Sequence, residues 1–122
     1  MDIKPLDMKS DNRGTLVEAF KLPADGQVNY INAMPGEPRG NHYHMRKTEC
    51  FLTIAGSTEM QVRDRDTGNL MKVISSGDRP MLISIFANHT HTITALEGGA
   101  IVLIWVDEPF NPADPDTFPE EI

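Results

Sequence analysis

The sequence predicts an all-β domain built from antiparallel strands, arranged as a sandwich or a small barrel. Nine Gly and nine Pro residues divide the 122-residue chain into pieces that are too short for ordinary helices. Several of these pieces alternate apolar and polar side chains, which is the pattern of a half-buried strand. No crossover helix is predicted between the strands, so we expect antiparallel pairing in a single domain over residues 1–122.

Nine strands are predicted in order along the chain, at residues 15–21, 28–33, 41–45, 49–55, 58–64, 70–75, 81–85, 91–96 and 100–106. The fifth shows the alternation clearly, because Met60 and Val62 interleave with three polar side chains. Residues 66–69 have the composition of a hairpin turn, and residues 97–99, Glu-Gly-Gly, are expected to join the last two strands in the same way. The last strand is apolar on both faces and is therefore expected to lie between the layers.

The end of the chain, residues 107–122, is acidic and rich in proline. Six of the 18 acidic residues lie there and none of the 11 Lys and Arg residues does, so residues 1–106 are nearly neutral, with 12 acidic and 11 basic residues. Three prolines, at positions 109, 112 and 115, remove backbone donors and prevent regular structure over residues 108–116. We therefore expect an extended tail that wraps the barrel or a partner.

Composition also excludes several classes of function. The formal net charge of -7 argues against a nucleic-acid-binding surface, which requires clustered basic residues. A single cysteine, Cys50, excludes an internal disulfide framework and is typical of a reducing compartment. No apolar run reaches the roughly 18 residues of a membrane span, and the first residues lack the apolar core of a signal peptide. We expect a cytoplasmic protein without nucleic-acid or membrane partners.

The most informative stretch of the sequence contains two histidines and a glutamate. His42 and His44 are two residues apart on a predicted strand, so both imidazoles point to the same face. Glu49 begins the next predicted strand, and His91 opens a later one. Three imidazoles and one carboxylate that converge inside a barrel would form a site for a divalent transition metal. The alternative interpretation is a buried polar network of the same four residues.

The chain also resembles a known group of proteins. The spacing His42-x-His44-x4-Glu49-x6-Gly56 resembles the first motif of the cupin superfamily, and His91 falls where the second motif has its histidine. Two longer stretches resemble the C-terminal cupin domains of bifunctional capsular-polysaccharide enzymes of the CapF type. These stretches are Arg39-Gly-Asn-His-Tyr-His44 and Trp105-Val-Asp-Glu-Pro-Phe-Asn-Pro-Ala-Asp-Pro-Asp-Thr-Phe118, and the similarity runs from about Lys9 to the C-terminus. More distantly, the chain is similar to ketoisomerases and 3,5-epimerases of deoxythymidine-diphosphate sugars.

The resemblance implies a fold, a reaction and a cofactor. The implied fold is a cupin-type antiparallel β-barrel, or jelly roll. The implied reaction, in surface polysaccharide biosynthesis, is epimerisation at C3 of a UDP- or dTDP-linked 4-keto-6-deoxy sugar. In the CapF group the barrel holds zinc, which implies a divalent metal, zinc, at His42, His44, Glu49 and His91 here.

The CapF group has a second, NADPH-dependent domain that reduces the ketone. The 122 residues contain no Gly-x-x-Gly-x-x-Gly segment, so we carry over only the isomerising half, without a nicotinamide cofactor. The chain is expected either to stand alone or to be one domain of a larger protein. The expected partners are the nucleotide sugar, a second copy of the chain in a homodimer and a separate sugar reductase.

The sequence departs from the pattern of the group at three places. A Pro-Pro-Gly turn before the second-motif histidine is replaced by Phe86-Ala87-Asn88, and Asn can adopt the left-handed backbone conformation that Gly supplies. A position that is often Tyr is His89. The Tyr that serves as general acid in the 3,5-epimerases is Phe110 here, which argues against a mechanism that needs a phenol.

The sequence offers two candidates for the base that removes the C3 proton. If the four clustered residues all hold a metal, His89 is the best base available, because imidazoles titrate near neutral pH. If no metal binds, His42 becomes the base, as its counterpart is in the metal-free epimerases. Arg39 is expected to bind the diphosphate because a guanidinium suits phosphate oxygens, and Lys47 and Arg13 are weaker candidates for that task.

Two alternatives stand beside the epimerase hypothesis. Cupins with three His and one Glu also activate oxygen, so a metal-dependent dioxygenase fits the same ligand spacing. A non-catalytic sugar-binding cupin fits it too. Turnover of a 4-keto sugar in deuterated water separates these classes, because enolisation incorporates solvent deuterium whereas binding does not. Oxygen consumption would identify a dioxygenase.

Overall fold

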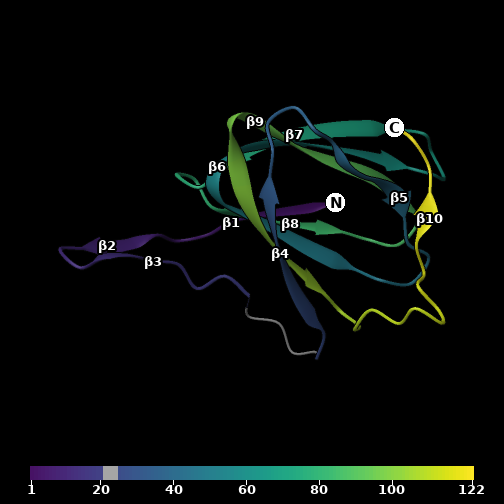
Figure 1. The fold of residues 1–122 in the computed structure, drawn as a ribbon, viewed down its shortest axis with the longest axis horizontal. Helices are drawn as coiled ribbons and strands as arrows, with labels where there is room; N and C mark the ends of the chain where they lie inside the picture. Colours follow the sequence, from purple (N-terminus) through teal and green to yellow (C-terminus); the bar gives the residue numbers. More distant parts are fainter. Residues whose placement is uncertain (21–24) are drawn as a thin grey trace.

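Two long strands organise the fold (Figure 1). The computed structural model describes residues 1–20 and 25–122, in which all regular structure is β-strand. The strands in these residues are β1 (Asp2–Pro5), β2 (Lys9–Asp11), β3 (Gly14–Leu16), β4 (Gln27–Ala33), β5 (Arg39–Tyr43), β6 (Glu49–Asp64), β7 (Leu70–Ser76), β8 (Met81–Ile85), β9 (His89–Val106) and β10 (Phe118–Pro119). No helix that could cross a membrane occurs in the described part of the chain.

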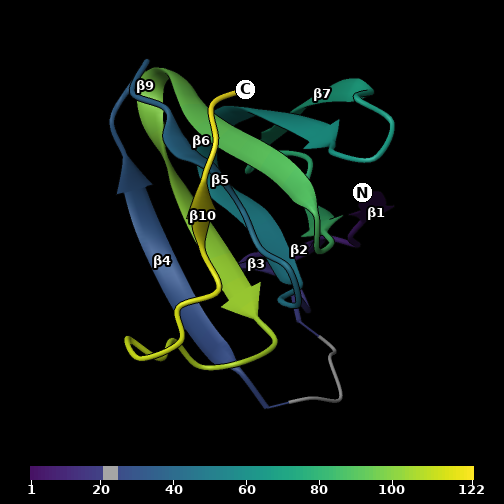
Figure 2. The ribbon, with the colours of Figure 1, turned by 90° about the vertical axis from the view of Figure 1, so that its right-hand side faces the viewer.

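The long strands β6 and β9 pair antiparallel over almost their whole length and contribute to two layers (Figure 2). The first half of β6 and the second half of β9 belong to one layer, with the order β1-β8-β6-β9-β4. The other halves belong to the second layer, with the order β7-β6-β9-β5-β10. The sheet does not close into a continuous barrel, but two antiparallel layers of this kind are consistent with the predicted jelly-roll class.

The strands change layer at glycines. Gly56 has a φ of +72°, and a Cβ atom added to it would lie 2.1 Å from the carbonyl oxygen of Gly99 on β9. Only glycine therefore allows the two backbones to approach this closely at the bend. The register of the β6–β9 pair shifts on both sides of this point, between Thr53 and Ala55 and between Gly56 and Thr58.

The inner faces of the two layers form the hydrophobic core. Its buried members come from β6, β8 and β9, and they are Phe51, Met60, Val62, Ile83, Ile85, Ile93, Val102, Ile104 and Val106. The alternation predicted for residues 58–64 is confirmed, because Met60 and Val62 are buried and their polar neighbours in the strand are half-exposed. The core therefore rests on period-2 patterning of strands from both layers.

Several details of the predicted strands are wrong. The strand expected at 41–45 is Arg39–Tyr43, so His44 follows it, and the strands expected at 49–55 and 58–64 are one strand, β6. The strand expected at 15–21 ends at Leu16, residues 17–20 are not in a strand, and residue 21 lies outside the described residues. Residues 97–99 form no hairpin turn but belong to β9, because β6 lies opposite both halves of that strand. The last strand is central within one layer rather than between layers, since its inward side chains are buried while Ile101 on its other face is 36% exposed. The hairpin at residues 66–69 is confirmed, with Gly68 N–H donating to the Asp64 carbonyl.

The C-terminal tail lies along the second layer. After β9, residues 107–117 form no strand, and β10 then pairs with the outer edge of β5, placing Phe118 opposite Tyr43 (Figure 2). The rings of these two residues stack with centroids 5.3 Å apart. β5 carries His42, the first histidine of the site described below, so the tail lies beside the strand that positions this residue.

Candidate functional site

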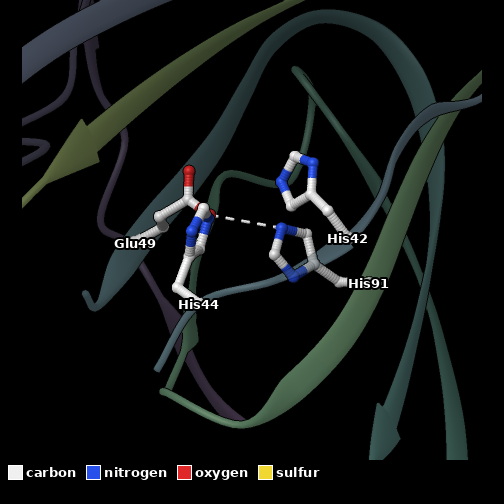
Figure 3. Close-up of side chains that lie close together, drawn as sticks. All are labelled: His42, His44, Glu49 and His91. Carbon is white, nitrogen blue, oxygen red and sulfur yellow. Dashed lines mark hydrogen bonds and ion pairs between the residues drawn. The ribbon is translucent and has the colours of Figure 1, made fainter. Parts of the chain in front are cut away.

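Four side chains from different parts of the chain meet between the two layers (Figure 3). His42 lies on β5, His44 follows that strand, Glu49 is the first residue of β6 and His91 is the third residue of β9. The nitrogen and carboxylate oxygen atoms that these residues offer all lie within 4.8 Å of one another. The structure thus brings together the four residues that the sequence predicts as one cluster.

Strand register brings the histidines together. His42 is paired with His91 across β5 and β9, and the centroids of their rings lie 4.8 Å apart. The two backbones approach closely just before this pair, because a Cβ atom on Gly40 would lie 2.6 Å from the carbonyl oxygen of His91. Asn41, with a φ of 53°, forms the irregularity that shifts the register between Gly40 and His42.

Glu49 joins two of the histidines. Its Oε1 atom lies 2.8 Å from His44 Nε2 and 3.2 Å from His91 Nε2. All three residues are buried, with 8%, 7% and 2% of the surface of Glu49, His44 and His91 exposed. His42 is half-buried, and its imidazole makes no hydrogen bond within the described part of the chain.

The outer ring nitrogens show which atoms carry protons. His44 Nδ1 lies 2.6 Å from the carbonyl oxygen of Asp116, and His91 Nδ1 lies 3.1 Å from that of His89. Carbonyl oxygens only accept hydrogen bonds, so both Nδ1 atoms donate and both Nε2 atoms of the neutral rings present lone pairs to Glu49. Lone pairs facing a carboxylate require a positive charge between them, either a second ring proton or a cation.

This arrangement fits a divalent metal. Metal-binding histidines usually donate their other N–H to a carbonyl or carboxylate, which is the pattern of His44 and His91. Imidazole nitrogens and a carboxylate oxygen are the donor set of zinc and related metals. His42, His44, Glu49 and His91 are therefore residues that could hold such an ion.

The electrostatics of the cluster separate the roles of its members. Burial, reinforced by the neighbouring His91 and His44, lowers the pKa of His42 to about 4, so this ring is neutral at pH 7. Burial opposes charge on Glu49, but hydrogen bonds from His44 and His91, which these rings donate when they also carry a proton on Nε2, outweigh it and hold the pKa of Glu49 well below its ordinary range. Burial also opposes charge on His44, yet its hydrogen bond to Glu49 raises its pKa overall. An ionised Glu49 thus faces a neutral His42.

An open cavity of about 830 Å³ leads to this cluster. Apart from Pro38, its lining comes from β4, β5, β6 and β9, and it includes Arg39, His42, Glu49 and His91. Arg39 is exposed, and its side chain makes no hydrogen bond or ion pair with any described residue. A cavity of this size accommodates a small-molecule ligand, and its one arginine side chain can meet an anionic group of that ligand.

The other predicted site residues lie elsewhere. Lys47 is buried, and its Nζ donates to the Pro115 carbonyl at 2.9 Å, so it holds the tail beside the cluster. Arg13 lies on the β2–β3 hairpin, where it pairs with Asp11 at 2.6 Å and does not line the main cavity. His89 also does not line that cavity, and its Nε2 lies 3.7 Å from Asp64.

Asp116 is a site residue that sequence reasoning missed. Its carboxylate accepts hydrogen bonds from the backbone N–H groups of Met45, Arg46 and Lys47, and only 4% of the residue is exposed. Burial alone would raise the pKa of Asp116, but these three hydrogen bonds lower it. The one signal in the sequence was its place in the Pro-Asp-Thr-Phe segment, which assigned it no role.

The turn before His91 keeps its geometry despite its unusual sequence. Asn88 has a φ of 62°, as predicted for the residue that replaces glycine. Its backbone N–H donates to the His44 carbonyl at 2.6 Å, and its side-chain oxygen accepts from Arg65 at 2.7 Å. The left-handed turn therefore connects the start of β9 to the segment that carries His44.

Known proteins similar to this chain include long ones, matched over about a third of their length, and a short one, matched over most of its length. Over 112 residues, the chain is 37% identical to a UDP-2-acetamido-2,6-beta-L-arabino-hexul-4-ose reductase of Pseudomonas aeruginosa. The match covers 91% of this chain but 30% of that protein. The crystal structure of the capsular polysaccharide assembling protein CapF from Staphylococcus aureus is 34% identical, with a TM-score of 0.78 over 97% of this chain and 35% of that one. The chain thus spans about a third of the length of these relatives.

A shorter neighbour matches over most of its own length. It is a 3,4-ketoisomerase from Helicobacter canadensis, with 25% identity and a TM-score of 0.77 over 96% of this chain and 88% of that chain. Enzymes of this kind among the neighbours support an enzymatic role for the chain. Residues 9–118 match the model of a family described as the polysaccharide biosynthesis C-terminal domain. Since the match includes the cluster and the tail, the chain belongs to the polysaccharide biosynthesis C-terminal domain family.

Proposed function

We propose that the chain epimerises or isomerises a nucleotide-linked 4-keto-6-deoxy sugar by moving the proton at C3. The observation that carries this proposal is the cluster of His42, His44, Glu49 and His91. Three of its members, His42, Glu49 and His91, line an open cavity together with Arg39. A hydrogen on a carbon next to a ketone is acidic, and its removal needs a base and a positive charge near the ketone oxygen. The relatives, a ketoisomerase and two proteins of sugar metabolism, support this class of substrate.

The positive charge near the ketone is proposed to come from a divalent metal, zinc. His44, Glu49 and His91 would hold it, with His42 as the fourth ligand, and when bound it would polarise the ketone oxygen. The lone pairs that His44 and His91 direct at Glu49 support a cation at this place.

The base is proposed to be His42 or His89. His42 lines the cavity, is neutral at pH 7 and has no hydrogen bond to another described side chain, all of which support its role as base. His89 faces Asp64, and its Nδ1 donates to the Ala87 carbonyl at 2.8 Å, so a substrate in the main cavity would reach it less directly. The two proposed roles of His42 predict different metal contents for His42→Asn: the metal is retained if His42 is the base and lost if it is a ligand.

Arg39 is proposed to bind the diphosphate of a UDP- or dTDP-linked sugar. It is the arginine that lines the cavity within the described residues, and it forms no ion pair with them that a phosphate would have to displace. Lys47 and Arg13 remain weaker candidates, because Lys47 is bonded to the tail and Arg13 is bonded to Asp11.

The proposed assembly is a homodimer in the cytoplasm, working with a sugar reductase on the same or a separate chain. The β2–β3 hairpin extends away from the two layers, and neither strand pairs with another described strand (Figure 1). An isolated two-stranded hairpin is marginal in water, so a second chain would stabilise it. The single free cysteine, which is buried, is compatible with a reducing compartment.

The experiment that tests the proposed function is solvent exchange. The chain is incubated in deuterated water with UDP- and dTDP-linked 4-keto-6-deoxy sugars, and deuterium at C3 is measured by mass spectrometry and NMR. An epimerase or isomerase incorporates deuterium, whereas a sugar-binding cupin does not. Oxygen uptake measured in parallel identifies a dioxygenase.

A further inference from the structure

Asp116 in the C-terminal tail forms hydrogen bonds with the segment that follows β5, through both its side chain and its main chain. The Asp116 carboxylate accepts from Met45 N–H at 2.9 Å and from the N–H groups of Arg46 and Lys47 at 3.1 Å each. Three successive backbone N–H groups around one carboxylate form an anion-binding concavity, a strong attachment for a tail.

The main chain of the same residue contacts the cluster. The Asp116 carbonyl oxygen accepts the Nδ1 proton of His44 at 2.6 Å, 72 positions away in the sequence. Asp116 has a φ of 47°, a left-handed conformation that Asp and Asn adopt more readily than most residues. Its side chain therefore fixes a carbonyl that in turn fixes the orientation of an imidazole.

We propose that Asp116 is a positioning residue, which holds His44 with Nε2 toward Glu49 and so sets the metal affinity of the cluster. This inference rests on the metal site of the proposed function. Partners of the outer nitrogen of a metal-binding histidine fix its tautomer and orientation, and their loss typically costs about 10- to 100-fold in affinity. Three of the four ligands would come from β5, β6 and β9, whereas His44 lies in the segment after β5 and its orientation depends on the tail.

Other contacts of the tail provide a matched control. Asp114, two residues earlier, pairs with Arg46 at 3.0 Å and its side chain is 62% exposed. It holds the tail but touches none of the four clustered residues. A change at Asp114 therefore loosens the tail without removing the hydrogen bond to His44.

The first measurement is the affinity of the whole chain for Zn²⁺, determined by competition with a chromophoric chelator. Asp116→Gly keeps a residue that allows the left-handed φ but removes the carboxylate, and we expect about 10- to 100-fold weaker binding. Asp116→Asn keeps one oxygen acceptor and should lose less. Asp114→Ala should bind like the wild type. Wild-type affinity in Asp116→Gly, or an equal loss in Asp114→Ala, would overturn the proposal.

The second measurement does not need a metal. Exchange of the His44 Nδ1 proton with water is followed by NMR in metal-free protein labelled with ¹⁵N-histidine. The hydrogen bond to Asp116 should make exchange slow in the wild type and about tenfold faster or more in Asp116→Gly. If Asp116→Gly does not fold, Asp116→Asn takes its place in both measurements.

The two measurements together separate the possible failures. If the wild type binds no Zn²⁺, the proposed metal site is wrong, and proton exchange alone decides whether Asp116 positions His44. If Zn²⁺ affinity falls while exchange at His44 is unchanged, the loss does not pass through His44 and the positioning role is wrong.

Discussion

His42 and His91 are paired across β5 and β9, with their rings edge to face and 4.8 Å apart. This pairing joins a histidine on the short strand β5 to one on the long strand β9, and Glu49 reaches the same space from the opposite layer. Three of the four cluster residues are therefore held on strands of the two layers, and His44, which follows β5, is held by its hydrogen bond to Asp116. A site built this way should change little when one ligand is removed, so single substitutions can test each role.

His91→Ala should lower divalent-metal affinity by about 100-fold or more, since a lost ligand should cost at least as much as a lost outer partner. Metal content after dialysis, measured by elemental analysis, should show one ion per wild-type chain and little in the variant. His89→Ala is the matched control, because His89 lies on the same strand but faces Asp64, and it should keep its metal. Full occupancy after replacing both His44 and His91 would refute the ligand set.

Removal of the metal should destabilise the fold. A ligand that binds only the folded state at 100 times its Kd stabilises it by about 2.7 kcal/mol, which corresponds to a Tm change on the order of 10 °C for a domain of this size. Thermal unfolding followed by circular dichroism should show this decrease on addition of a chelator. His91→Ala should show none, and a chelator effect of the same size in that variant would mean that the metal binds elsewhere.

His42→Asn should slow C3 exchange by about 100-fold or more, because it removes either the base or a ligand. Metal content decides between these roles. Retained metal would identify His42 as the base, and lost metal would identify it as a ligand and leave His89→Asn to slow exchange by a similar factor. Wild-type exchange in both variants would exclude both histidines as bases.

Arg39→Ala should raise KM for a nucleotide-linked sugar by about tenfold or more, because a hydrogen bond to a charged group contributes about 1.5–3 kcal/mol. The value of kcat should change less, since the diphosphate lies away from the reacting carbon. Arg79→Ala is the control, as Arg79 is exposed and does not line the cavity. Equal effects of the two substitutions on KM would remove Arg39 from the binding site.

Light scattering at micromolar concentration should give twice the mass of the chain. Deletion of residues 9–16, the β2–β3 hairpin, should shift the protein toward the monomer if this hairpin contacts a second chain. A monomeric wild type would contradict the proposed homodimer.

Local patterns predicted most of the fold. Alternation in β6 and the turn at residues 66–69 depend on neighbouring residues, so the sequence alone was enough for them. The bends at Gly56 and at residues 97–99 could not be predicted in the same way. There the two halves of β6 and β9 pair continuously around a corner, and that pairing depends on contacts between distant residues.

The site shows the same division. The spacing of His42, His44 and Glu49 predicted that they lie together, but for a reason that holds only in part: His44 was expected on the same strand as His42, and instead it follows β5. Asp116 could not be found this way, since its role comes from a tail that returns over 72 positions to the segment after β5. Neither could the partners of Lys47, whose ammonium group is bonded to the tail instead of facing the main cavity.

The most direct test of the proposed function is deuterium incorporation at C3 of a UDP- or dTDP-linked 4-keto-6-deoxy sugar incubated with the wild-type chain. We predict incorporation that is lost or at least about 100-fold slower in His42→Asn and little changed in Arg79→Ala. Absence of incorporation with every such sugar, under conditions in which the chain is folded and loaded with metal, would contradict the epimerase proposal and favour a sugar-binding role.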